Sequence, residues 1–216
     1  MFLKDIAVGV FNKKNPYQLR FNKETWCVSA LYLSCLSKKY DTKGFQKIVV
    51  SIVNDKTSID KIEKGLDVIS ITKFIDFEEY FQLVPFNRKK RVFCTLHEGF
   101  LAIAKHEGWE TEPVIIAYNC CLAKKLEHRW LRKDKYFLSP DRQCYAGVFC
   151  DWDIDKFEAF AVFLNKQKEE IARIKLFQTE PHMVDPMGKM GWDKGTGEFY
   201  LYSKDERSKW TALPVL

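Results

Sequence analysis

Residues 86–131 constrain the fold most, because their apolar side chains recur at the spacing of two amphipathic helices. The first helix is predicted over residues 87–107, and Gly108 follows it as a terminating glycine. Its expected buried face consists of Val92, Phe93, Leu96, Phe100, Ile103 and Ala104. Thr111 is placed to cap a second helix. The apolar positions of that helix repeat at three and four: Ile115, Tyr118, Leu122, Leu126 and Trp130. The joining loop is short, so we expect the two helices to be antiparallel neighbours.

The segments on either side of this helical pair favour β-strands. Residues 45–53 and 66–75 are rich in β-branched side chains. The full set of predicted strands is 6–11, 17–21, 25–36, 45–53, 66–75, 144–152, 157–164, 170–177, 199–202 and 210–213. Two alternatives stay open, because residues 25–36 would also suit a helix and residues 157–177 fit either a hairpin or one helix. Asp76, with Glu79 three residues later, is expected to cap a short helix that Pro85 ends.

A run of strands, then helices, then strands indicates the α+β class. We expect mainly antiparallel N-terminal and C-terminal sheets, with the central antiparallel helix pair packed on them. No internal repeat or linker divides the chain, so a single domain is predicted over residues 1–216. The alternative is a set of sub-lobes at residues 1–85, 86–131 and 132–216.

Composition narrows the class of protein. Hydrophobic residues make up 46% of the chain and charged residues 30%, which is typical of a globular rather than a disordered protein. Residues 1–5 lead into a β-like run instead of a cleavable export signal, and no stretch is long and apolar enough to cross a bilayer. The seven cysteines, an odd number among mainly apolar neighbours, are expected to be reduced thiols packed in a core. A soluble, cytoplasmic protein without membrane contact is therefore predicted.

The net charge of +6 is concentrated on the helical pair. Residues 86–143 carry 12 Lys and Arg against 7 Asp and Glu. Four consecutive cations stand near the start of the first helix: Arg88, Lys89, Lys90 and Arg91. Clustered cations can bind phosphates or an acidic protein surface, although a short basic run is more often only a solvated helix face. We take these four residues as a candidate binding surface.

Thiols and imidazoles also gather on the helical pair. The potential metal ligands are Cys94 and His97 on the first helix and Cys120, Cys121 and His128 on the second. Zinc prefers such ligands, but the vicinal cysteines point in different directions and the paired C-x-x-C spacing is missing. Core packing of the thiols is the simpler interpretation. We expect no cofactor and keep these five residues only as metal candidates.

Residues 180–197 are predicted to form a long loop with the composition of a binding element. Their polar and aromatic side chains are Glu180, His182, Asp185 and Trp192. Three methionines, Met183, Met187 and Met190, supply adaptable apolar surface. Loops held on a rigid scaffold often carry binding residues. The binding candidates in this segment are His182, Met187 and Trp192.

The sequence contains no phosphate-binding loop, dinucleotide-binding, esterase or kinase signature. We therefore expect a non-enzymatic protein-binding module, such as a microbial inhibitor or a toxin-neutralising immunity-type protein, with another protein as its partner. The alternative is an enzyme or accessory factor that acts on nucleic acid or a phosphorylated ligand. In that alternative the basic run anchors the ligand, and His97, Glu98 or His128 transfers protons.

Overall fold

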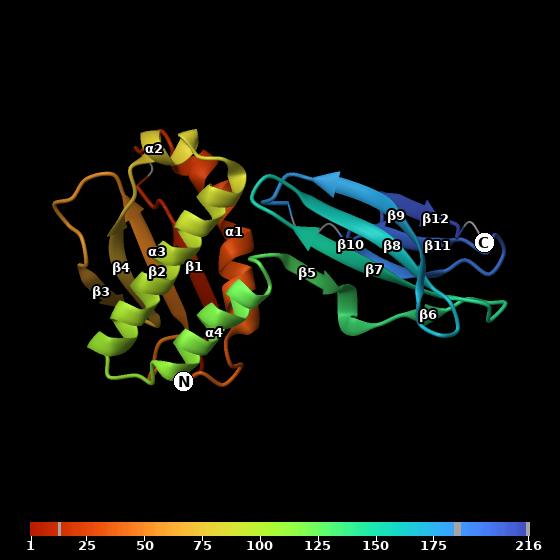
Figure 1. Cartoon of the computed structure of the whole chain (residues 1–216), viewed down its shortest axis with the longest axis horizontal. Coiled ribbons are helices and arrows are strands. Elements are labelled where there is room, and N and C mark those ends of the chain that lie inside the picture. The colour runs from red at the N-terminus through yellow and green to blue at the C-terminus, as the bar shows by residue number, and fades with distance from the viewer. Residues whose placement is uncertain (13, 184–186, 215–216) are drawn as a thin grey trace. The chain divides into compact units, whose positions relative to one another are not determined.

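The computed structural model describes residues 1–12, 14–183 and 187–214, and the chain divides into two compact units. The first unit is Met1–His128 and the second is Arg129–Leu216. Figure 1 shows helices in the first unit, whereas the second is built from strands. The boundary falls close to the predicted sub-lobe boundary between residues 131 and 132. The single domain over residues 1–216 stays a prediction.

The N-terminal unit is built on a four-stranded sheet in the order β1-β2-β4-β3. Its strands are β1 (Asp5–Gly9), β2 (Lys47–Val53), β3 (Ile62–Gly65) and β4 (Val68–Phe74). The α+β class is confirmed. The β1–β2 and β2–β4 pairs are parallel, however, and only β3 and β4 pair antiparallel. In β2 the buried residues Ile48, Val50 and Ile52 alternate with partly exposed ones, as expected for a sheet with one face on the core.

The first helix, α1 (Gln18–Cys35), replaces the strands predicted at residues 17–21 and 25–36, so the helical alternative for the second segment is the observed state. The reason is topological. Adjacent parallel strands cannot be joined by a tight turn and need a long crossover, which is usually a helix. Because β1 and β2 are parallel, α1 serves as that crossover and packs against β1. Local β-propensity is overridden by this connection.

The remaining helices are α2 (Phe77–Gln82), α3 (Pro85–His106) and α4 (Glu112–Ala123). Asp76 caps α2 as predicted, because its carboxylate accepts hydrogen bonds from the backbone N–H groups of Glu78 and Glu79. The predicted apolar face of α3 is buried against β2 and β4. Gly99 permits this approach, since a Cβ there would lie 2.8 Å from Val50 Cγ2. Within the described residues, no helix is long and apolar enough to span a membrane.

The corner between α3 and α4 has the predicted terminating glycine. Gly108 has a positive φ of 64°, and its N–H donates to the Lys105 carbonyl at 3.3 Å. The N–H of Trp109 donates to the Ala104 carbonyl at 2.8 Å, which completes a Schellman turn. In Figure 1, α4 runs back alongside α3, so the antiparallel pair is observed.

The α4 helix is shorter than predicted, because it ends at Ala123. Lys125 and Leu126 both have positive φ, a conformation that cannot continue a right-handed helix. Trp130 consequently lies on strand β5 (His128–Leu131) rather than on the helical stripe.

The C-terminal unit contains two sheets. The five-stranded sheet has the order β5-β7-β8-β9, with β6 also paired to β7, and the three-stranded sheet has the order β10-β11-β12. A short 3-10 helix, η1 (Arg132–Asp134), follows β5, and the remaining strands are β6 (Phe137–Leu138), β7 (Tyr145–Trp152), β8 (Phe157–Leu164), β9 (Glu170–Thr179), β10 (Met187–Trp192), β11 (Phe199–Ser203) and β12 (Lys209–Ala212). The hairpin predicted over residues 157–177 is confirmed by the antiparallel β8–β9 pair.

Candidate functional site

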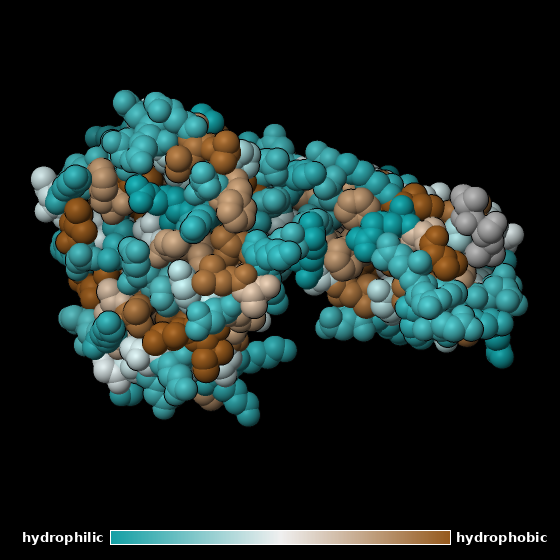
Figure 2. Space-filling view, in the orientation of Figure 1, coloured by the Kyte–Doolittle hydropathy of each residue, from teal (hydrophilic) through white to brown (hydrophobic). Residues whose placement is uncertain are grey.

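The α4 helix presents an apolar face to solvent. Its outward side chains, at the spacing of one helical face, are Ile115, Ile116, Asn119, Leu122 and Ala123. The large apolar side chains Ile115, Ile116 and Leu122 are 43%, 56% and 42% exposed. Figure 2 shows apolar side chains gathered on the N-terminal unit where Figure 1 places α4. Contiguous exposed apolar surface of this kind marks interaction sites more often than isolated exposed residues do.

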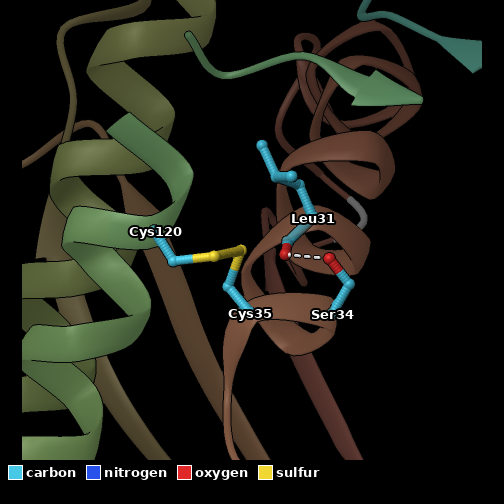
Figure 3. The surroundings of a disulfide bond; sticks show 4 residues. All are labelled: Leu31, Ser34, Cys35 and Cys120. Carbon is cyan, nitrogen blue, oxygen red and sulfur yellow. Dashed lines mark hydrogen bonds between the residues drawn. A yellow bond between two sulfur atoms is a disulfide. The ribbon is translucent and has the colours of Figure 1, made fainter. Parts of the chain in front are cut away.

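The other sides of α4 are fixed within the N-terminal unit. The residues that point into the core are Val114, Ala117 and Cys121, all fully buried. On one flank a disulfide joins Cys120 to Cys35 of α1, with their Cα atoms 5.9 Å apart, and Figure 3 shows the two side chains pointing toward one another. On the other flank Tyr118 stacks on Phe93 of α3, with ring centroids 4.9 Å apart. Because α1 and α3 hold both flanks, only the apolar face remains outward.

Charged residues of opposite sign stand at the two ends of this face. Glu110 and Glu112 are exposed at the N-terminal end of α4, and Lys124 and Lys125 are exposed at its C-terminal end. Glu112 lies in the first turn, where a negative charge is favourable to the helix dipole. The surface is thus an apolar strip with an acidic end and a basic end.

The sequence prediction missed this surface, because it assigned Ile115 and Leu122 to a buried stripe. A signal was present in the sequence. The inward side of α4 carries the apolar residues Val114 and Ala117, and the outward side carries Ile116. The helix is therefore apolar on nearly all of its sides. A helix of this kind is buried only if partners surround it.

A cluster of aromatic, imidazole and thiol groups lies where α1, α3 and α4 meet. The hydroxyl of Tyr32 donates to the Val114 carbonyl at 3.0 Å and lies 2.8 Å from Nδ1 of His97. Because the one hydroxyl proton is used on the carbonyl, Nδ1 of His97 is the donor in that contact. Burial lowers the pKa of His97, which favours the neutral imidazole. Tyr118 stacks on the same ring at 4.2 Å, and Cys94 neighbours Tyr118.

The hydrogen bond to Tyr32 and the stack with Tyr118 hold the His97 ring in one orientation, which is typical of a histidine with a structural role. The Cys94 thiol is partly exposed. Glu98, which was also proposed for proton transfer, follows His97 on α3 and is exposed. The group therefore supplies packing and hydrogen bonds between three helices.

The five proposed metal ligands do not converge. The expectation that all thiols are reduced is wrong for Cys35 and Cys120, which form the disulfide. Cys121 is buried, and burial raises its pKa to about 12. His128 Nδ1 lies 3.4 Å from the Cys27 carbonyl, and burial lowers the pKa of His128 to about 4. In the part of the chain that the structure describes, no group of three His, Cys, Asp or Glu side chains could hold a metal ion.

The disulfide also bears on the expected cellular location. Structural disulfides are rare in reducing compartments. The prediction of a cytoplasmic protein rested in part on reduced thiols, so it loses that part of its support and stays a prediction.

The basic run does not form one exposed surface. Arg88 Nε donates to Glu24 Oε2 at 2.8 Å, and both side chains are nearly buried. The Tyr80 hydroxyl donates to the same carboxylate oxygen at 2.9 Å. Lys89 is 4% exposed, so only Lys90 and Arg91 extend into solvent. The pairing of Arg88 explains why a cation persists near a helix N-terminus, where the helix dipole opposes it.

The predicted binding loop at residues 180–197 contains a strand, β10, and His182, Met187 and Trp192 differ in how far they are exposed. Met187 begins β10 and is 3% exposed, whereas Trp192 ends β10 and donates from Nε1 to the Phe137 carbonyl at 2.9 Å. His182 is partly exposed, with Nδ1 3.2 Å from Glu180. Asp185 lies outside the described residues. Met187 and Trp192 thus contribute to packing in the C-terminal unit.

A hollow of about 540 Å³ lies at the α3–α4 corner. Three of its polar side chains, Tyr40, Asp41 and Lys43, already have partners within the N-terminal unit. Lys43 Nζ donates to the Gly108 carbonyl at 3.2 Å, and the Tyr40 hydroxyl donates to the Glu110 carbonyl at 2.7 Å. Asp41 binds the N-terminal ammonium group at 2.8 Å. These contacts tie the corner to the chain before β2.

Comparisons with known proteins provide no assignment, because no protein-family model, curated protein or solved structure matches this chain.

Proposed function

We propose that this chain is a non-enzymatic protein-binding module and that the outward apolar face of α4 is its contact surface. The observation that carries the proposal is the exposure of Ile115, Ile116 and Leu122 on one side of a helix whose other sides are fixed. Protein interfaces typically have an apolar centre with a polar rim. The α4 face has that composition, since its charged residues lie only at its two ends.

The rigidity of α4 supports the same proposal. Binding costs less when the contact residues are already ordered. The Cys35–Cys120 disulfide and the Tyr118–Phe93 stack fix the helix before any partner arrives. An inhibitor or immunity-type protein is the finer form of the proposal, and it predicts one tightly bound protein of a different sequence.

The alternative, binding of nucleic acid or a phosphorylated ligand through the basic run, has weaker support. Of its four cations, Lys89 is buried and Arg88 is nearly buried and paired with Glu24, so the remaining exposed charge is small. Neutralising few phosphates gives weak binding that is lost at moderate salt.

The proposal is tested by capturing partners from the native host on the wild-type protein and on two variants. Ile116→Glu places a carboxylate at the centre of the α4 face, and Leu19→Glu, at a position that is 71% exposed on α1, is the matched control. We expect Ile116→Glu to lose a partner that the wild type and Leu19→Glu both retain. Equal retention by all three proteins would contradict the proposal, provided that their thermal unfolding is the same.

A further inference from the structure

The charge pattern of the α4 face identifies the kind of partner that fits it. We propose that this face binds the same face of a second copy of the chain, with the two α4 helices antiparallel about a two-fold axis. The inference rests on the proposed function, since it assumes that the α4 face is a contact surface. A second copy of the chain fits this surface because the surface is complementary to itself.

The self-complementarity comes from the two ends of the face. In an antiparallel pair, the acidic end of one helix, at Glu112, lies beside the basic end of the other, at Lys124 and Lys125. A parallel pair would bring like charges together. The antiparallel pair also sets each positive helix N-terminus beside the negative C-terminus of its neighbour. Closed two-fold pairing of one surface with itself is the commonest form of protein oligomer.

The register follows from the positions of the outward residues. Asn119 is central on the face, with Ile115 and Ile116 on one side and Leu122 and Ala123 on the other. If the axis passes at Asn119, then Ile116 meets Leu122 of the second copy and Ile115 meets Ala123. One of these contacts joins two large apolar side chains, and the other joins a large side chain to a small one.

Asn119 itself then faces the same residue of the second copy. Its amide carries both donors and an acceptor, so two asparagines related by a two-fold axis can bond each other. One polar residue in an otherwise apolar helix contact fixes the register, because any shift leaves its amide unpaired. The single polar residue of the face therefore has a specific place in the dimer.

The register is tested by cysteine cross-linking. Two Asn119→Cys chains would have their thiols at the axis, where the Cα atoms come within the limit of about 7 Å for a disulfide. The matched control is Ile116→Cys, because the two copies of residue 116 would be offset by about 9 Å along the helices. Under a mild thiol oxidant we expect a covalent dimer from Asn119→Cys and little from Ile116→Cys or the wild type, which carries the same native cysteines.

The charge pattern is tested by sedimentation of the wild-type protein over a range of concentrations. Glu112→Lys and Lys125→Glu each place like charges together, and we expect either change to weaken dimerisation by about tenfold. The double variant Glu112→Lys/Lys125→Glu restores opposite charges across the axis and should recover most of the loss. Thermal unfolding of each variant separates weaker pairing from local unfolding.

A wild-type protein that stays monomeric at every concentration, with no cross-link at Asn119→Cys, would overturn the inference. The proposed function would survive that result if Ile116→Glu still loses a partner of a different sequence. Both proposals fail if the α4 variants change neither self-association nor capture.

Discussion

The α4 helix and the β10 strand differ from their sequence predictions in opposite directions. The helix, predicted to be structural, has an exposed apolar face, and the strand lies in a segment predicted to be a binding loop. The apolar stripe of the helix was expected to pack within the helical pair, yet Ile115 is 43% exposed and Leu122 is 42% exposed. The strand belongs to a segment that was expected to be an exposed binding loop, yet Met187 is 3% exposed. Both segments are rich in apolar side chains, so composition does not separate them. What separates them is the number of elements that surround each one.

Geometry explains the difference between these two regions. The β10 strand pairs with β11, and the unit packs its side chains among those of the neighbouring strands. The α4 helix has α1 on one flank, α3 on the other and the core beneath, and its remaining face is not covered by any described element of the N-terminal unit. A helix of this composition therefore remains partly exposed unless another chain covers it.

Stability measurements on β10 provide the strongest test of the difference between the buried strand and the exposed α4 face. Met187→Ala removes a buried side chain, and we expect it to lower the free energy of unfolding of the C-terminal unit by about 2–5 kcal/mol. Chemical denaturation followed by tryptophan fluorescence provides the measurement. A loss below 1 kcal/mol would show that Met187 is not packed as described.

The disulfide is expected to have the next largest effect, because it holds α4 against α1. Replacing both Cys35 and Cys120 by Ser should lower the free energy of unfolding of the N-terminal unit by about 2–4 kcal/mol, since the bond closes a long loop in the unfolded chain. Cys94→Ser, at a free and partly exposed thiol, is the control. Indistinguishable denaturation curves with and without reductant would contradict this expectation.

A third prediction concerns His128, which follows α4 and contacts the Cys27 carbonyl of α1. Its pKa is about 4 in the folded state against an ordinary 6.5, so the unfolded chain binds the extra proton between these values. The free energy of unfolding therefore has its full value above about pH 6.5, where His128 is neutral in both states. It decreases as the pH falls toward 4, because only the unfolded chain takes up the proton. The full loss corresponds to about 3 kcal/mol. Unfolding measured across this range should show a smaller pH dependence in His128→Gln than in the wild type, and an equal dependence would refute the assignment.

The smallest effect on stability is expected at the α4 face itself. Ile116→Ser should change the free energy of unfolding by no more than about 0.5 kcal/mol, because the side chain is already largely in water. The measurement is thermal unfolding at a concentration low enough to keep the protein monomeric. A large destabilisation would place Ile116 in the core and remove the contrast with Met187.

The sequence patterns predicted elements whose surroundings are simple. The α3 helix has one apolar face and lies against one sheet, so its periodicity located the buried residues from Val92 to Ala104. The β8–β9 hairpin was recognised from its two apolar runs, although a helix fitted the same residues. The Gly108 turn was also found, because a positive φ at a helix end strongly selects glycine.

Other features depended on long-range pairing that no local pattern carries. The α1 helix follows from the parallel pairing of β1 with β2, which are distant in the sequence. The Arg88–Glu24 pair joins residues 64 positions apart, and it converts a cation of the predicted basic surface into a buried structural group. The same holds for the Cys35–Cys120 bond, whose partners are 85 positions apart. These three relations explain why the strands predicted at residues 17–36, the predicted basic surface and the predicted reduced thiols differ from the structure.

The disulfide also determines how the N-terminal unit would respond to force. A pull on the two chain ends is transmitted through Cys35 and Cys120, which are 85 positions apart, so the residues between them bear no load while the bond is intact. Those residues contain β2, β3, β4, α2 and α3, which make up most of the sheet and its main covering helix. Reduction would release about 290 Å of additional extended chain. The bond thus makes most of the N-terminal unit a closed ring that stretching cannot unravel.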